Sequence, residues 1–245
     1  MRSLILAIQF LTRLPTPQLR NFDPAELAGA AAWFPVVGLI VGTLVGGSAL
    51  LAGQFDDWLA ALLALLMWTW VTGALHLDGL ADLCDALGAA HRDPRRLLEV
   101  MRDPHLGSFG VIALIVMLLS KLVLLQVALQ HAALSIWSLP LLCAWARIGA
   151  IAWSAYLPPL ADSSTERFVW QINKHTLMWN LATLLLITAA LAPALLIAPL
   201  VLLGWGWFLK HRLGGMSGDC LGAGIEVTEV ILLLACLLPA IVSKS

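Results

Sequence analysis

The chain has 245 residues, of which 60% are hydrophobic and 12% are charged, and its mean hydropathy is +0.90. Soluble domains carry about 25% charged residues, so this composition excludes an ordinary water-soluble fold. The formal net charge is −1, which excludes a nucleic-acid-binding surface, and the four cysteines form no CxxC pair of the kind found in zinc ribbons.

The first residues predict an amphipathic helix that lies on the membrane. Leu4, Ile8 and Leu11 recur at helical spacing, and Pro15 ends the run. The segment lacks the small-residue cleavage pattern of a signal peptide. We therefore expect an interfacial helix over residues 1–14 and no cleaved leader.

Hydrophobic runs near the length that crosses a bilayer recur along the rest of the chain. They predict seven spans, over residues 28–51, 58–75, 107–129, 134–157, 177–192, 194–209 and 225–242. Only the stretch around Pro193 divides the fifth span from the sixth, so one long tilted span is the alternative. We expect residues 1–245 to form one all-α domain, a polytopic transmembrane helix bundle.

The distribution of Lys and Arg favours seven spans. The basic residues that precede the first span or lie in loops between spans are Arg2, Arg13, Arg20, Arg92, Arg95, Arg96, Arg102, Arg167, Lys174, Lys210 and Arg212, and with seven spans they all fall on one side of the membrane. The connections on the other side contain no Lys or Arg. The positive-inside rule makes the basic side cytoplasmic, and both carboxylate clusters described next lie on that side.

The first cluster, Asp78, Asp82 and Asp85, follows the second span. On a helix turning about 100° per residue, these three side chains share one face. Carboxylates so close together repel each other unless a cation lies between them, and Mg²⁺ is the hard ion that prefers oxygen ligands. The alternative is a solvated acidic helix face, which the apolar residues between the aspartates disfavour.

The second cluster begins in a glycine-rich turn that leads into the last span. Gly215 and Gly218 suit a loop that cradles phosphate, although glycines also serve in helix packing. Asp219 and Glu226 are seven residues apart and share a helix face. Glu226 and Glu229 lie at or inside the membrane, where a charge costs about 3 kcal/mol, so we expect both to be functional or paired.

Several cationic residues complete the pattern. Arg102, Asp103 and His105 lie at the mouth of the third span, whereas Lys121 and Arg147 lie inside the third and fourth spans. Buried cations need anionic partners, either protein carboxylates or a phosphate-bearing ligand, and both alternatives are open here. Carboxylates, Mg²⁺ and basic residues together indicate phosphoryl transfer from a nucleotide-activated donor.

At these residues the chain resembles the cobalamin synthase family, the adenosylcobinamide-GDP ribazoletransferases. The matching positions are Phe10–Pro15, Phe34, Pro35, Gly38, His76–Asp82, Asp85, Met101–Asp103, Leu106, Gly107, Lys121, Arg147, Leu213–Gly215, Gly218, Asp219, Leu221–Ala223, Ile225 and Glu226. The His-x-Asp-Gly-x-x-Asp-x-x-Asp run combined with Gly-Gly-x-x-Gly-Asp is specific. Pro104 and His105 depart from the Ser-Arg that is frequent in the family.

The resemblance implies a membrane enzyme that joins the two halves of vitamin B12. A ribose hydroxyl of α-ribazole, or of its 5′-phosphate, attacks the cobinamide-side phosphorus of adenosylcobinamide-GDP and expels GMP. The implied setting is the bacterial inner membrane, with the active site facing the cytoplasm. A homo-oligomer or a complex with enzymes of the same pathway is left open.

Residue roles carried by the resemblance are hypotheses. The expected catalytic residues are Asp82, Asp85 and Glu226, with Asp82 or Asp85 as general base. The expected Mg²⁺ ligands are Asp78, Asp82, Asp85 and Asp219. The expected substrate-binding residues are Arg13, His76, Arg102, Asp103, His105, Lys121, Arg147, Gly215 and Gly218.

Two other functions compete with this one. A CDP-alcohol phosphotransferase also uses an Asp-Gly helix with bound metal, but it expects an aspartate where Leu75 stands. A proton- or cation-coupled transporter also carries intramembrane carboxylates. Its site should lie near mid-membrane, whereas these clusters lie at span ends.

Overall fold

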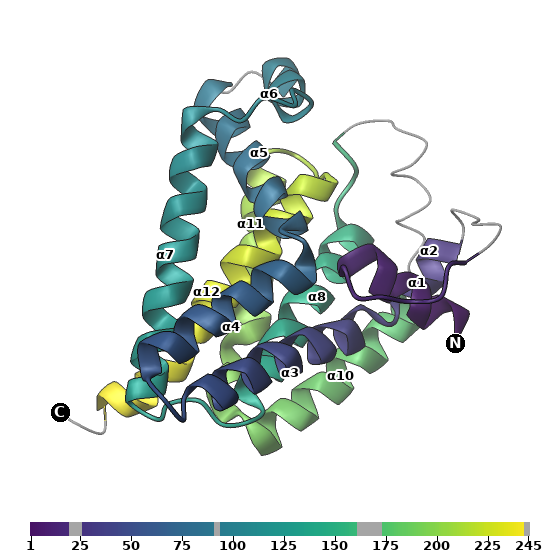
Figure 1. The fold of residues 1–245 in the computed structure, drawn as a ribbon. Coiled ribbons are helices and arrows are strands. Elements are labelled where there is room, and N and C mark those ends of the chain that lie inside the picture. Colours follow the sequence, from purple (N-terminus) through teal and green to yellow (C-terminus); the bar gives the residue numbers. More distant parts are fainter. Residues whose placement is uncertain (20–25, 91–93, 161–172, 243–245) are drawn as a thin grey trace.

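The computed structural model describes residues 1–19, 26–90, 94–160 and 173–242, and helices dominate them (Figure 1). The helices are α1 (Arg2–Leu11), α2 (Glu26–Ala31), α3 (Phe34–Ala52), α4 (Asp57–Thr72), α5 (Leu75–Ala89), α6 (Pro94–Met101), α7 (Ser108–Gln130), α8 (Ser138–Tyr156), α10 (Lys174–Leu191), the 3₁₀ helix η1 (Pro193–Ile197), α11 (Ala198–Arg212) and α12 (Gly218–Val242). The predicted all-α class is confirmed.

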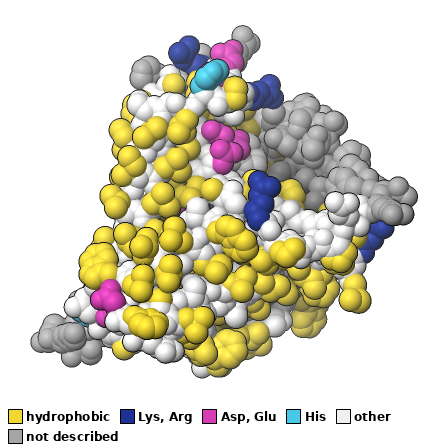
Figure 2. Space-filling model, in the orientation of Figure 1, with side chains coloured by type: hydrophobic (Ala, Val, Ile, Leu, Met, Phe, Trp, Pro, Cys, Tyr) yellow, Lys and Arg dark blue, Asp and Glu magenta, His cyan; other side chains and the backbone are white. Residues whose placement is uncertain are grey.

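Helix α8 forms the centre of the bundle. It packs against α3, α10 and α12, and its side chains are buried along almost its whole length. Helix α12 also contacts α5 and α7, so it joins the centre of the bundle to the part of the chain that carries the aspartates. The exposed side chains of the outer helices are largely hydrophobic, as expected for a surface in lipid (Figure 2).

The helices that meet the length and hydropathy expected of a membrane span are fewer than the seven predicted. Among the described residues, five helical segments are long and apolar enough to cross a membrane: 34–52, 108–130, 138–156, 193–212 and 218–238. A sixth span results if the bent pair α4 and α5 is counted as one. The multi-pass prediction is therefore confirmed with five or six spans instead of seven, and α10 is a helix outside this set.

Prolines explain the start of the first span, which differs from the prediction, and the predicted division at Pro193. The first span begins at Phe34, not residue 28, because Pro35 lacks an amide hydrogen and is favoured in the first turn of a helix. The chain also turns at Pro193, so α10 and α11 are separate helices and the alternative of one long tilted span is wrong. Figure 1 shows these two helices running in different directions.

A sharp elbow separates α4 from α5. Gly73 and Ala74 both have left-handed backbone conformations, with φ of 60° and 58°, and the two helices are bent by 85°. Such a conformation is strained for alanine, and strained residues cluster at functional sites. Arg13 reinforces the elbow, because its amide donates to the Val71 carbonyl at 2.8 Å and its side chain lies against Gly73.

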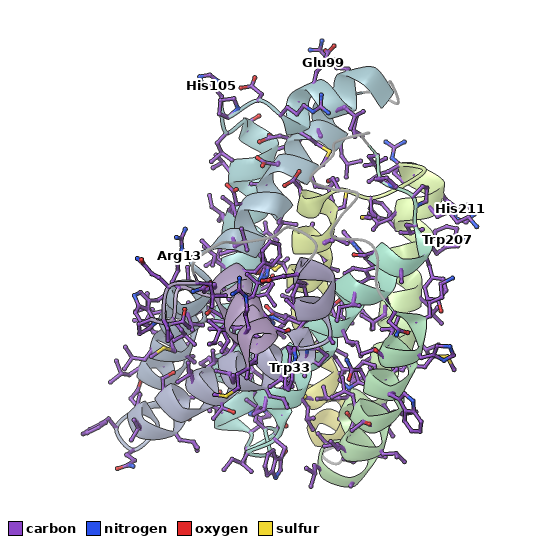
Figure 3. All side chains as sticks on the ribbon, turned by 90° about the vertical axis from the view of Figure 1, so that its right-hand side faces the viewer. Arg13, Trp33, Glu99, His105, Trp207 and His211 are labelled. Carbon is purple, nitrogen blue, oxygen red and sulfur yellow. The ribbon has the colours of Figure 1, made fainter. Side chains whose placement is uncertain are left out.

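On the face shown in Figure 2, the Lys and Arg side chains lie in the upper and middle parts, and none lies at the lower end. Glu99 and His105 lie at the upper end, and His211 lies on the same half, whereas α12 ends on the opposite side (Figures 1 and 3). The positive-inside argument concerns Lys and Arg, and the orientation that it gives stays a prediction. Arg20, Arg92 and Arg167, which also contributed to that argument, lie outside the described residues.

Candidate functional site

Two glycines bring the carboxylate clusters together by allowing the backbones of α5 and α12 to touch. A Cβ atom placed on Gly79 would lie 2.8 Å from the Cα atom of Asp219, and one on Gly222 would lie 3.2 Å from the Cα atom of His76. Side chains at these positions would force the helices apart. The motif on α5 and the glycine turn before α12, distant in sequence, therefore form one site.

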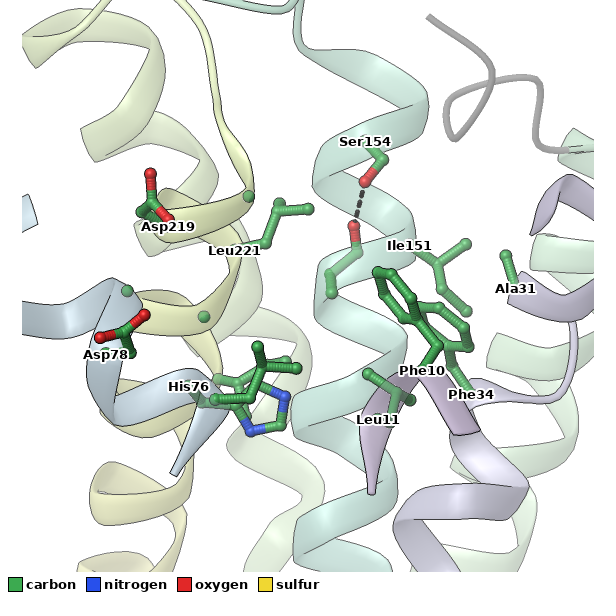
Figure 4. Close-up of a pocket in the computed structure, with 16 residues that line it drawn as sticks. Phe10, Leu11, Ala31, Phe34, His76, Asp78, Ile151, Ser154, Asp219 and Leu221 are labelled. Carbon is green, nitrogen blue, oxygen red and sulfur yellow. Dashed lines mark hydrogen bonds between the residues drawn. The ribbon is translucent and has the colours of Figure 1, made fainter. Parts of the chain in front are cut away.

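A cavity of about 310 Å³ opens beside this helix contact. Its lining residues are Phe10, Leu11, Ala31, Phe34, Leu75, His76, Asp78, Gly79, Ala150, Ile151, Ser154, Gly218, Asp219, Leu221, Gly222 and Ile225. Figure 4 shows the carboxylates of Asp78 and Asp219 on one side and the rings of Phe10 and Phe34 on the other. The cavity thus has an acidic wall and an aromatic wall, as ligand sites commonly combine apolar surface with a few polar groups.

The acidic wall has no cationic partner in the part of the chain described. Asp82 lies within electrostatic range of Asp78, Asp85 and Asp219, and none of the ion pairs among the described residues involves Asp78, Asp82 or Asp219. Mutual repulsion of these carboxylates favours binding of a cation. Ser217 donates a long hydrogen bond of 3.5 Å to Asp219 Oδ2.

These donors fit Mg²⁺ in kind, because Mg²⁺ prefers oxygen and usually takes one or two carboxylates together with water and substrate phosphate. They do not form a closed protein cage. Among the described residues, no group of three or more His, Cys, Asp or Glu side chains is arranged to hold a metal ion. By themselves, these carboxylates would supply only part of the coordination sphere of Mg²⁺.

Asp85 has a different environment from the other aspartates. It is buried, and its two carboxylate oxygens accept hydrogen bonds from the amides of Gly107 and Gly110, each at 2.8 Å. These amides belong to the first turn of α7, which has no intrahelical acceptors for them. Asp85 therefore attaches the start of α7 to α5, and its predicted roles as metal ligand and base compete with this contact.

Replacing Asp85 with alanine is expected to lower the free energy of unfolding by about 2 kcal/mol, because two buried amides lose their acceptor. Equilibrium unfolding in detergent micelles measures the change. Asp85→Asn keeps one acceptor oxygen and should cost less, and Glu99→Ala, at an exposed position, serves as control. Equal stability of Asp85→Ala and the wild type would contradict the anchoring role.

A network of buried charges lies deeper in the bundle. Lys121 Nζ contacts Glu226 Oε2 at 2.7 Å and Glu229 Oε2 at 2.5 Å, and Arg147 Nη1 pairs with Glu229 Oε1. Trp68 Nε1 donates to Glu229 Oε1 at 3.3 Å, and its ring lies 4.3 Å below Lys121 Nζ. The expectation that these charges are paired is confirmed, and the partners of both cations are protein carboxylates.

His76 lies between this network and the cavity. Its side chain is 3% exposed, it lines the cavity, and neither ring nitrogen has a hydrogen-bond partner among the described residues. Arg147, whose Nε and Nη2 atoms are likewise unpartnered, lies within electrostatic range of the ring. Buried polar atoms are nearly always satisfied, so His76 is a strong candidate to bind a ligand in the cavity.

The connection between α6 and α7 is exposed and does not line the cavity. His105 bonds to Asp103 Oδ1 through its amide at 3.0 Å and through ring Nδ1 at 2.6 Å. These hydrogen bonds hold the pKa of the Asp103 carboxyl below its usual value. Figure 3 shows His105 near the upper end of the molecule, and Arg102 is likewise exposed, so both would meet only a ligand that extends beyond the cavity.

The predicted substrate-binding residues therefore fall into distinct places. His76 and Gly218 line the cavity, and Arg13 lies at the elbow. Gly215 faces protein instead of the cavity, since a Cβ there would lie 2.5 Å from the Pro158 carbonyl oxygen. Hydrogen bonds from Met216 to Pro158 and from Leu160 to Met216 fix this turn in place.

Some residues of the site carry no chemical role in the sequence-based prediction. Phe10 and Phe34 occur in matching motifs, but nothing in their spacing indicates that their rings stack, with centroids 5.8 Å apart and planes at 17°. The sequence around Trp68 does not indicate that its indole contacts Glu229. Glu229 itself could have been included, because a second intramembrane carboxylate three residues after Glu226 predicts a shared partner.

Comparison with known proteins identifies the group to which this site belongs. The sequence profile of CobS, cobalamin-5-phosphate synthase, matches residues 3–237. The chain belongs to this family. Both residue motifs that form the cavity fall inside the matched region, and neither the CDP-alcohol phosphotransferase nor the transporter alternative is supported.

Similar proteins cover nearly the whole chain. Adenosylcobinamide-GDP ribazoletransferases of Laribacter hongkongensis and Thiobacillus denitrificans are 59% and 50% identical, over 96% of this chain and 96% and 94% of their own lengths. The enzyme of the same name from Novosphingobium aromaticivorans is 50% identical, over 96% of both chains. No solved structure matches the chain significantly.

Proposed function

We propose that this chain is an adenosylcobinamide-GDP ribazoletransferase of a bacterial inner membrane, with its site on the cytoplasmic face. The observation that carries the proposal is the cavity at which Asp78 of α5 and Asp219 of α12 meet. Its family membership and the names of its relatives supply the substrates. The acceptor is α-ribazole or its 5′-phosphate.

In this reaction a ribose hydroxyl of the acceptor forms a new ester bond to the cobinamide-side phosphorus of the donor. The bond from that phosphorus to the bridging oxygen breaks, and GMP leaves with the bridging oxygen. Asp82, half-buried beside the other carboxylates, accepts the hydroxyl proton. Asp85 is the poorer base because both of its oxygens already accept amide hydrogen bonds.

Asp78 and Asp219 would hold Mg²⁺, which when bound neutralises charge on the diphosphate and the departing phosphate. The chain positions the reactants around them. The amide of Gly218 begins α12, and Arg13 lies at the elbow, so both suit contacts to phosphate oxygens. Lys121 and Arg147 do not contact the substrates, because they are buried and paired with glutamates.

The experiment is a reconstitution with purified protein in lipid nanodiscs. Incubation with adenosylcobinamide-GDP, α-ribazole and Mg²⁺ is expected to produce adenosylcobalamin and GMP in equal amounts. Mass spectrometry measures both products. EDTA should abolish both products, and added Mg²⁺ should restore them. A folded preparation that makes neither product, also with α-ribazole 5′-phosphate as acceptor, would overturn the proposal.

A further inference from the structure

The proposed reaction brings two substrates of very different size to one site, and the cavity matches only one of them. Its volume of about 310 Å³ is at the small end of ligand pockets. A nucleoside made of one fused-ring base and a ribose is of this size. A corrin macrocycle that carries a nucleotide diphosphate is far larger, so most of the donor must lie outside.

The charge of the cavity also selects its occupant. Asp78 and Asp219 are its acidic lining residues, and no Lys or Arg is present among the described residues that line it. An uncharged nucleoside can lie against such a wall directly, whereas the diphosphate of the donor can approach these carboxylates only with a cation between them. Hydroxyl groups of a ribose can approach these carboxylates, and buried His76 offers unpartnered ring nitrogens to the same sugar.

The opposite wall provides a flat apolar surface. Phe10 and Phe34 stack on each other, and buried Leu11 and Ile151 continue this surface. Aromatic side chains of this kind bind the faces of bases. The hydroxyl of Ser154, three residues after Ile151, already donates to the Ala150 carbonyl, so this side of the cavity offers no free side-chain donor and suits a base without exocyclic polar atoms better than guanine.

We propose that this cavity is the acceptor pocket, with the base of the nucleoside against Phe10 and Phe34 and its ribose toward Asp78, Asp219 and His76. The inference rests on the proposed function, because it names which of the two substrates enters. It makes Phe10 and Phe34 specificity-determining residues for an apolar fused-ring base. The donor then approaches from outside, across the carboxylates.

The test separates binding of the two substrates. For Phe10→Leu/Phe34→Leu in nanodiscs, we expect the KM for α-ribazole to rise about tenfold, because base stacking is lost, while the KM for adenosylcobinamide-GDP stays within twofold. Calorimetric titration with α-ribazole, in Mg²⁺ without donor, should show the same loss of affinity. Phe10→Tyr should bind like the wild type, and Phe55→Leu, an exposed aromatic outside the cavity, is the matched control.

The outcomes distinguish this inference from the proposed function. If the wild type forms product but the double variant raises the KM for the donor, or leaves both KM values unchanged, the pocket assignment alone fails. Displacement of bound α-ribazole by GMP at similar concentration would also overturn it, because guanosine would then be the occupant. If the wild type forms no product, the proposed function fails. Should the double variant not fold, Phe10→Leu, at a side chain 44% exposed, gives the same comparison.

Discussion

Asp82→Asn is expected to lower kcat about 10³-fold, because the variant keeps the shape of the site but cannot accept the proton of the attacking hydroxyl. The KM values should change little, since asparagine keeps the shape of the side chain and can still accept a hydrogen bond from the hydroxyl. Steady-state kinetics at saturating Mg²⁺, with both substrates varied, measure these quantities. Unchanged turnover would remove Asp82 from the mechanism.

The control for this substitution must show that loss of a negative charge alone does not cause the fall in kcat. Glu99→Gln removes one negative charge from the same end of the protein, at an exposed position away from the cavity, and should leave kcat unchanged (Figure 3).

Asp219→Asn should act differently from Asp82→Asn. It is expected to raise the Mg²⁺ concentration needed for half-maximal rate, because Asp219 is proposed to hold the ion.

The second large effect concerns stability. Glu229→Gln should lower the free energy of unfolding by about 3–5 kcal/mol, because Lys121 loses one carboxylate partner and Arg147 loses its only one among the described residues. The carboxylate is fully buried, so solvent cannot replace it. Equilibrium unfolding in detergent micelles measures the loss.

A double-mutant cycle tests whether pairing causes this loss. Arg147→Met combined with Glu229→Gln should be more stable than the sum of the two single effects predicts, because no unpaired guanidinium remains. Lys121 still has Glu226 in the double variant, at 2.7 Å. Strictly additive effects would show that Glu229 stabilises the bundle by packing alone.

The sequence predicted the features that depend on local pattern. Long apolar runs gave a multi-pass helical bundle, and the spacing of Asp78, Asp82 and Asp85 gave a helix, now observed as α5. The candidate spans number five or six instead of about seven, because α10 falls outside the set and α4 qualifies only together with α5. A bend of 85° at Gly73 and Ala74 turns α5 away from α4, and no apolar count records such a bend.

The site was predicted in part for the same reason. Glycine turns and carboxylates are visible in sequence, so Asp78 and Asp219 were found, although their roles remain predictions. The contact through Gly79 and Gly222 depends on which helices pack together. The sequence alone does not distinguish a glycine that allows helices to pack from one in a phosphate-binding loop. The capping role of Asp85 likewise depends on the position of α7, which only the tertiary structure gives.

The order of synthesis gives the buried charge network a further consequence. Lys121 and Arg147 leave the ribosome about a hundred residues before Glu226 and Glu229, so they enter the membrane while both carboxylates are still missing. Two unpaired cations in lipid are costly, and the bundle reaches its stable arrangement only when α12 arrives. The bundle is therefore complete only once α12 has inserted. A chain that ends before α12 should keep unpaired cations in the membrane and be degraded by membrane proteases.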